Sequence, residues 1–271
     1  MAKITKKDET NVSTNVVNLE EDAGLGTENI KSDELKVPYM KLLQGSSDEI
    51  KKGSDKYIPN AEPGDLYIES TGQIFKGDQG IKVICVMYLN TFNEWSTRTA
   101  PAETKLPAPI IHTQNIMHLT VKEGTKDILK DDPYRVIENT GNHFCLLLDD
   151  DYNEVGHAVI TMAISKKKVS DAWNTMIKNQ RAPKASGTGT YNPASFAQIY
   201  DFESQSEKSK AGELYHNYRV SFDRIIDTTS EKECELYIKA KKLHETFKEM
   251  DMTSSNPEGS SVKSLEEKTP F

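Results

Sequence analysis

Six basic side chains lie within one short segment of a chain that is acidic overall. Residues 166–184 contain a single acid, Asp171, so the segment has a net charge of +5 while the whole chain carries −8. Three of the lysines would begin a predicted helix, where the macrodipole disfavours each cation by roughly 0.3–1 kcal/mol. Because these lysines destabilise the helix, we expect their charge to have a function. Clustered cations bind phosphates. The six residues are Lys166, Lys167, Lys168, Lys178, Arg181 and Lys184.

Aromatic side chains could stack on nucleic-acid bases. Proteins that bind single strands combine a basic groove with aromatic side chains, and each stacked base contributes about 1–3 kcal/mol. The competing interpretation leaves the lysines as a solvated helix face and the aromatic residues in the core. We favour that interpretation for Trp173, which lies on the apolar face of the predicted helix. The candidate stacking platforms are Trp95, Tyr191, Tyr200 and Tyr215, and Arg219 is a further candidate cation.

Other chemistries have weaker support in the sequence. Asp149, Asp150 and Asp151, together with Glu154, could collect Mg²⁺, but consecutive acids between two predicted strands are more often turn residues. The six histidines show no HExxH spacing, and the chain contains no G-x-x-x-x-G-K-[ST], GxSxG or GxGxxG motif. We therefore expect no catalytic residue, no metal and no cofactor.

Composition limits the class of protein. The 271 residues are 36% hydrophobic and 28% charged. No apolar run approaches about 18 residues and the N-terminus lacks an apolar signal core, so we expect a cytoplasmic protein without a membrane partner. The three cysteines, Cys85, Cys145 and Cys234, show no CxxC spacing and are expected to be reduced thiols.

Charge and polarity also predict the domain organisation. Residues 1–34 and 250–271 are polar and together hold six of the eight net negative charges. Such segments cannot bury a core, so we expect a disordered N-terminal segment and a disordered acidic C-terminal tail. One domain at 35–249 remains between them, and its first apolar residues, 35–43, could form a short helix or an extended arm. Pro101, Pro107 and Pro109 interrupt the segment 96–141, which we interpret as an inserted subdomain.

Apolar periodicity predicts one helix between two groups of strands. Helical spacing indicates a helix at 166–180, which Ser165 could cap and Pro183 would end, and a C-terminal helix after a capping box of Ser230 and Glu233. In the last strand we expect Leu214 to face inward with Tyr218, Val220 and Phe222. Alternating or continuous apolar patterns indicate strands at 65–69, 81–92, 142–148, 155–164, 195–202 and 214–225.

The last five of these strands, with the helix between the third and the fourth, have the element order of an OB-fold. That fold is a partly open Greek-key barrel that binds oligonucleotides. We therefore predict an α+β protein with an OB-like five-stranded antiparallel barrel, an inserted subdomain, a C-terminal helix and disordered termini.

The final residues of the chain resemble the C-terminal tip of bacterial and phage single-stranded DNA-binding proteins. Two acids precede a terminal Pro-Phe, although Lys268 and Thr269 stand where that family usually has a further acid and an aliphatic residue. In the family the tip is a docking peptide for replication and repair proteins. The resemblance implies this docking role for Glu266, Glu267, Pro270 and Phe271.

The body of the chain is also similar to phage DNA-binding proteins, in the segments Leu42-Leu43-Gln44 and Glu94-Trp95. The two likenesses imply a phage-type single-stranded DNA-binding protein that acts in DNA replication and recombination in the host bacterial cytoplasm. Its expected partners are single-stranded DNA and, through the tail, replication or recombination proteins; a homo-oligomer is compatible with the sequence. The main alternative is a phage structural or adaptor protein that binds only protein, and a remoter one is a metal-dependent nuclease that uses residues 149–151.

Overall fold

The computed structural model describes residues 37–209 and 212–249. The described residues all belong to one compact unit. The N-terminal segment and the C-terminal tail predicted to be disordered, with the docking residues Glu266, Glu267, Pro270 and Phe271, lie outside the described residues.

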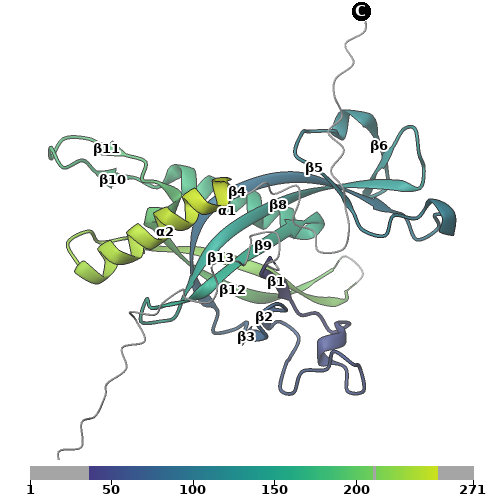
Figure 1. Cartoon of the computed structure of the whole chain (residues 1–271), viewed down its shortest axis with the longest axis horizontal. Helices are drawn as coiled ribbons and strands as arrows, with labels where there is room; N and C mark the ends of the chain where they lie inside the picture. Colours follow the sequence, from purple (N-terminus) through teal and green to yellow (C-terminus); the bar gives the residue numbers. More distant parts are fainter. Residues whose placement is uncertain (1–36, 210–211, 250–271) are drawn as a thin grey trace, which may run out of the picture. The chain divides into compact units, whose positions relative to one another are not determined.

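Five long strands form the centre of a curled sheet that has eleven strands within the described residues (Figure 1). They pair antiparallel in the order β13-β12-β4-β8-β9. The structure therefore confirms a mixed α+β fold, but the five-stranded barrel is not confirmed, because the sheet continues beyond β9. The strands are β4 (Ile81–Ser96), β8 (Arg135–Leu148), β9 (Glu154–Ala163), β12 (Gln198–Lys208) and β13 (Leu214–Ile225).

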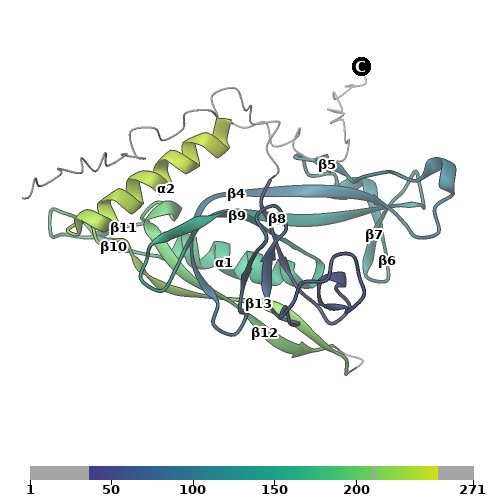
Figure 2. The same ribbon diagram turned by 60° about the horizontal axis from the view of Figure 1, so that its bottom comes forward.

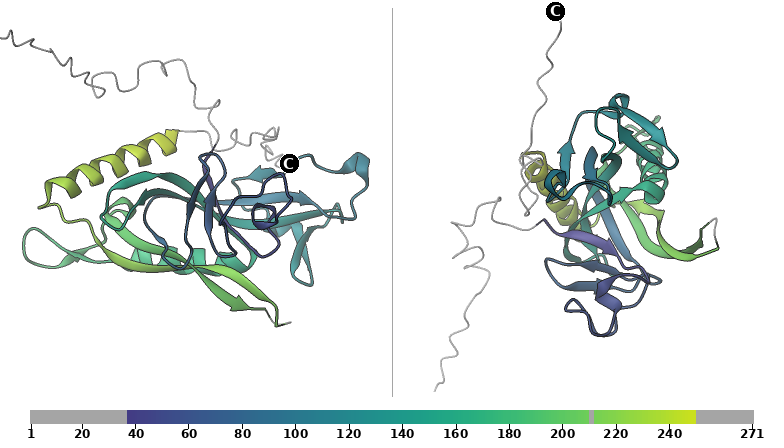
Figure 3. Two further views of the ribbon diagram at one scale, coloured as in Figure 1. Left: turned by 90° about the horizontal axis from the view of Figure 1, so that it is seen from below. Right: turned by 90° about the vertical axis from the view of Figure 1, so that its right-hand side faces the viewer.

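A small three-stranded segment extends this sheet past β9. β1 (Tyr39–Leu42) runs parallel to β9, and β2 (Leu66–Ile68) and β3 (Gln73–Phe75) follow it antiparallel. The first apolar residues thus form an extended arm and not a helix. The Gln44 side chain then bonds both backbone groups of His216 in β13, each at 2.9 Å. An amide that donates to the carbonyl and accepts from the N–H of one residue imitates strand pairing, so it ties the β1 end of the sheet to β13. Figure 3 shows β1–β3, in purple and dark blue, beside the long strands.

The two helices lie on opposite faces of the long strands (Figure 2). α1 (Lys167–Asn179) packs on the inner face around Trp173, and α2 (Glu231–Glu249) packs on the outer face through Leu236, Ala240 and Phe247. A strand covered on both sides needs apolar residues on both sides. This coverage explains the almost uninterrupted apolar run that begins at Ile81.

The contact of α1 with the sheet is close and partly polar. His143 of β8 stacks on Trp173 with ring centroids 4.2 Å apart, and its Nε2 lies 2.9 Å from the Ser170 hydroxyl. Next to this pair, a Cβ on Gly141 would lie 2.3 Å from the Ser170 hydroxyl oxygen. Only glycine allows the helix to approach β8 at this position.

The inserted segment between β4 and β8 adds three short strands to the same sheet beyond the core. β4 and β8 are both longer than predicted, so the insertion proper is 97–134. Its apolar residues pack on Phe92 and Ile137 of the extended strands. Its strands are β5 (Ile110–His112), β6 (Thr120–Glu123) and β7 (Lys126–Leu129). Among them β5 pairs with β4, β7 pairs with β8, and β6 pairs with β7.

The remaining elements are short. A two-stranded hairpin, β10 (Ala182–Pro183) with β11 (Thr190–Tyr191), follows α1. Single turns of 3₁₀ helix connect other elements: η2 (Asp48–Ile50), η3 (Ala102–Thr104), η4 (Met117–Leu119), η5 (Ile164–Lys166) and η6 (Ser195–Ala197).

Several local predictions need correction. Ser165 does not cap α1, because η5 occupies the residues before it and the capping residue is Lys166, whose side chain forms no capping bond. The expected strand 195–202 starts as η6 and runs on to Lys208. Leu214 is 70% exposed and does not face inward. The Glu233 carboxylate accepts from Arg224 and from the backbone N–H of Asp227, each at 2.7 Å, so it serves the β13–α2 turn.

Neither described helix is long and apolar enough to cross a membrane.

Candidate nucleic-acid interface

A groove of about 850 Å³ crosses the outer face of β4, β8, β9 and β1. Its apolar end is formed by Leu89, Phe144 and Val159, which also belong to the cluster under α2. The groove therefore continues the α2-covered face into the part of the sheet that no described helix covers. Along β4 the outward residues change accordingly, from Ile84 and Val86 under α2 to polar residues beyond it.

Threonine and asparagine side chains form the floor of this groove. Asn142 Nδ2 donates to Thr91 Oγ1 at 3.0 Å, Thr91 Oγ1 donates to Asn93 Oδ1 at 3.0 Å, and Asn93 Nδ2 donates to Thr140 Oγ1 at 3.3 Å. The four residues come from two strands whose register sets Thr91 opposite Thr140. Amides and hydroxyls both donate and accept, so the floor can form hydrogen bonds with polar groups of either kind.

An aromatic residue and a carboxylate stand at the far end of the groove. Trp95 is 40% exposed, and it lies beside Glu138 of β8. Burial raises the pKa of Glu138, and the neighbouring Trp95 indole partly offsets this effect. This end of the groove therefore combines an accessible aromatic ring with a carboxyl group that holds its proton more tightly than usual.

Two lysines line the groove near β1 and η5. Lys41 forms ion pairs with Glu69 and, at 3.7 Å, with Glu49. Lys166 forms no ion pair within the described residues; its amine lies 4.9 Å over the ring of Tyr218, and burial lowers its pKa. Lys166 is thus the lysine of the groove with no acidic partner in the described chain.

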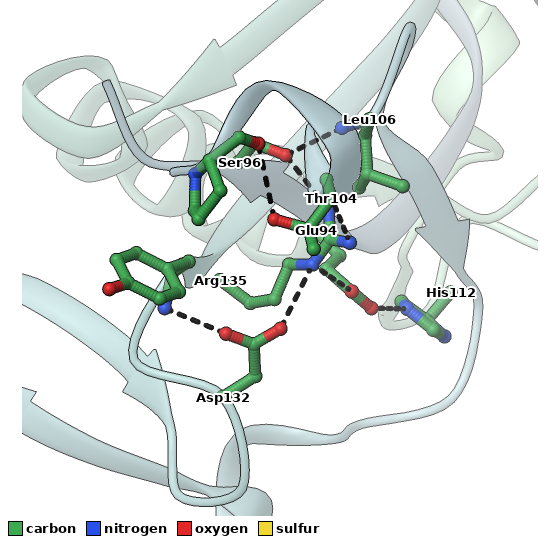
Figure 4. A network of polar contacts seen from close by, with 9 residues as sticks. Glu94, Ser96, Thr104, Leu106, His112, Asp132 and Arg135 are labelled. Atoms are coloured by element: carbon green, nitrogen blue, oxygen red, sulfur yellow. Dashed lines mark hydrogen bonds and ion pairs between the residues drawn. The ribbon is translucent and has the colours of Figure 1, made fainter. Parts of the chain in front are cut away.

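One wall of the groove comes from the segment 107–111 of the insertion, and Arg135 helps to hold this segment in place (Figure 4). Its guanidinium donates to Ser96 Oγ and to the Thr104 carbonyl, both at 2.8 Å. The same group lies 3.7 Å from Glu94, whose other oxygen contacts His112 Nε2 at 3.0 Å. One side chain therefore connects the ends of β4 and β8 with both ends of the wall.

A second groove, of about 400 Å³, lies between α1 and β13. It brings together Lys168, Tyr215 and Arg219, three of the residues predicted from the sequence. The Tyr215 hydroxyl donates to Glu207, and this bond lowers the pKa of Glu207. Asn217 Nδ2 is 3.3 Å from each oxygen of the same carboxylate.

The other predicted residues are distributed differently. Trp95 and Lys166 line the first groove, whereas Lys167 is engaged by Asp171 one turn further along α1. The remaining predicted cations and Tyr191 are exposed at the opposite end of α1 and in the β10–β11 hairpin, where they line neither groove: Lys178, Arg181, Lys184 and Tyr191.

Tyr200 is a correction to the predicted platforms. It is wholly buried, its hydroxyl contacts Gln198 Oε1, and its ring packs edge-on against Trp173. A base could not stack on it without opening the core. Trp173 is buried as expected.

The acidic turn between β8 and β9 has a local structural role. Asp149 Oδ1 accepts from the backbone N–H groups of Asp151 and Asn153, at 2.9 and 2.8 Å. Among the described residues, no group of three or more His, Cys, Asp or Glu side chains is arranged to hold a metal ion.

Sequence reasoning missed the groove floor. Thr91, Asn93, Thr140 and Asn142 gave a weak signal, because polar residues replace apolar ones on one side of an otherwise apolar strand. Ile164, the exposed residue on the groove rim, gave none.

The comparisons with known proteins identify a family. The model of the Pam3 phage gp34-like protein family matches residues 7–253, which is most of the chain. No curated protein and no solved structure matches it. The chain therefore belongs to the Pam3 phage gp34-like protein family, a family of bacteriophage proteins.

Proposed function

We propose that the protein binds single-stranded DNA without sequence preference, along the groove on the outer face of β4, β8 and β9, in phage DNA replication or recombination. The single observation that carries this proposal is the position of the groove. It crosses the second and third of the five long strands and is bounded by the loop between the first and second. In OB-folds, oligonucleotides bind on the face of strands 2 and 3 and on the loop between strands 1 and 2.

The strand pairing supports an OB-like description of the core. β4 pairs with β8 and β12, β8 pairs with β9, and β12 pairs with β13, with α1 between the third and fourth strands. In this description β1 occupies the opening between β9 and β13, where Gln44 bridges to His216. The additional strands are then additions to an OB-like core.

The groove contains the groups that non-specific binding of a single strand needs. Trp95 offers a ring for stacking, which is sequence-tolerant because every base has a π-face. The threonine and asparagine side chains of the groove floor offer hydrogen bonds. Lys166 offers a cation for a phosphate. No group in this set performs chemistry on the strand, so we propose a binding protein and not an enzyme.

The C-terminal tip adds a proposed partner function. The acids Glu266 and Glu267, followed by Pro270 and Phe271, would dock on replication or recombination proteins through their charge and the Phe271 ring.

Anisotropy of a fluorescent oligo-dT at two salt concentrations tests the DNA proposal. The logarithm of the association constant should fall linearly with the logarithm of the salt concentration, with a slope of about 0.7 per phosphate contacted. Trp95→Ala should weaken binding by about 1–3 kcal/mol because a stacking platform is lost. Tyr134→Ala is the matched control, since Tyr134 is also 40% exposed but does not line the groove.

The two ends of α1 provide a second matched pair. Lys166→Glu should weaken binding and reduce the salt slope by about 0.7, whereas Lys178→Glu, at the end of the helix away from both grooves, should change the slope little. Absence of oligo-dT binding by the folded protein at low salt would contradict the proposal and favour an adaptor that binds only protein. Equal effects of the Trp95 and Tyr134 variants would remove this groove from the site.

A further inference from the structure

Ile164 has a strained backbone and an exposed side chain. Its φ is 53°, and 70% of its surface is accessible. A positive φ is rare for a β-branched residue, because its side chain clashes with the backbone there. Strained residues persist where the surrounding structure fixes them and are concentrated at functional sites. An exposed apolar side chain on a strained backbone therefore suggests that Ile164 has a function.

Ile164 lies where the two grooves meet. Ile164, Ser165 and Lys166 form η5 and line the first groove, and Ser165 also lines the second. Lys168, three residues after Ser165, lies in the second groove. The two grooves therefore open on either side of this single turn.

The second groove has the same two ingredients as the first. Lys168 and Arg219 are exposed cations on its rim, and Arg219 has only a 3.8 Å contact with Glu203. Tyr215 contributes a half-buried ring whose hydroxyl is anchored on Glu207. Anchoring fixes the ring before a ligand arrives, which lowers the entropy lost on stacking.

We propose that a single strand bound in the first groove continues across η5 into the second, and that Ile164 inserts between two successive bases at the crossing. This inference rests on the proposed function of the first groove. Apolar wedges, isoleucine among them, unstack base steps in other nucleic-acid complexes. A single strand resists such a wedge less than a duplex does, because its bases are unpaired. The left-handed backbone of Ile164 would then serve to point this side chain away from the protein surface at the crossing.

The test uses the full chain and a length series of fluorescent oligo-dT, from about 4 to about 20 nucleotides, which brackets typical site sizes. Ile164→Gly and Ile164→Ala should each weaken binding of the longest oligomer by roughly threefold to tenfold, because one partly buried apolar contact is lost. Lys168→Glu with Arg219→Glu should weaken the longest oligomer and leave the shortest that binds unaffected, since the shortest fills only the first groove.

Two controls separate binding from folding. Glycine adopts a positive φ without a clash, so Ile164→Gly should leave Tm unchanged or raise it while affinity falls. Ile238→Ala removes an isoleucine that is 63% exposed on α2 and lines neither groove, and it should leave affinity unchanged.

The outcomes distinguish this inference from the proposed function. If Trp95→Ala weakens binding but both Ile164 variants bind the longest oligomer as the natural protein does, the wedge is wrong and the first groove stands. If the Lys168 and Arg219 double variant binds oligo-dT of every length as tightly as the natural protein does, the strand does not enter the second groove and the inference is overturned. If no oligomer binds to the folded protein, both proposals are wrong.

Discussion

Glu138 is the residue of the first groove whose charge opposes the proposed ligand. It lies at the far end of the groove next to Trp95, and burial raises the pKa of its carboxyl group. A raised pKa means that the folded protein holds this proton more tightly than the unfolded chain does. The ionised carboxylate therefore lowers stability above the raised pKa, and this penalty disappears as the pH falls through it.

Glu138→Gln should remove that penalty and the repulsion of a phosphate together. We expect higher stability than the natural protein at neutral pH, no advantage at acidic pH, and an oligo-dT affinity higher by about twofold or more at low salt. Urea unfolding at two pH values and anisotropy at low salt measure these effects. A stability gain that persists at acidic pH would show that the carboxylate charge is not its source.

At the scale of elements, one side chain strengthens the attachment of the insertion to the strands beyond the pairing of β5 with β4 and of β7 with β8. Arg135 begins β8 and bonds Ser96 at the end of β4 and the Thr104 carbonyl in the loop. Its contact with Glu94 also balances a carboxylate that is mostly buried. The wall of the first groove is therefore held by these side-chain bonds in addition to the pairing of β5 with β4, the pairing of β7 with β8 and a small apolar cluster.

Arg135→Ala should loosen this wall without unfolding the core. Loss of hydrogen bonds to a charged donor, with Glu94 left without that contact, should cost about 1–3 kcal/mol. Limited proteolysis should cut residues 97–134 faster, and oligo-dT affinity should fall with the loss of the wall. Arg98→Ala is the matched control, since Arg98 is exposed in the same segment and makes no ion pair in the described chain. If the two variants are cut at the same rate, Arg135 does not hold the wall.

At the scale of the whole molecule, the proposed activities divide between the described residues and the C-terminal tip. The described residues contain the two grooves, and the tip with Phe271 lies outside the described residues. The tip is acidic, so it would compete with DNA for the cations of the grooves, most strongly at low salt, where charges are least screened.

Deletion of residues 265–271 should therefore leave DNA affinity unchanged or tighten it, with the larger effect at low salt. The same deletion should abolish capture of purified replication or recombination proteins, and Phe271→Ala should reproduce that loss without a change in DNA affinity. Anisotropy and pull-down measure the two effects separately. Weaker DNA binding together with unaltered protein capture would contradict the docking role.

The sequence by itself determined the main strands, both helices and the polar ends. Local periodicity carries this information, so α1 matches its prediction to within one residue at each end and β13 matches its predicted range. The apolar stripe also placed Trp173 in the core. The alternating pattern of a strand could not predict whether Tyr200 and Leu214 are buried. A period of two defines two faces of the strand but does not show which face is covered.

Only the tertiary structure decided where the candidate site lies. The groove floor joins Thr91 and Asn93 to Thr140 and Asn142 through the register of β4 and β8, a pairing between residues about fifty positions apart. Its position depends on where α2 stops covering the outer face, and its wall depends on Arg135. The basic segment that stood out in the sequence is divided by the fold between two ends of one helix. Charge clustered along a chain therefore does not stay clustered in space, because a helix of thirteen residues separates its ends by about 20 Å.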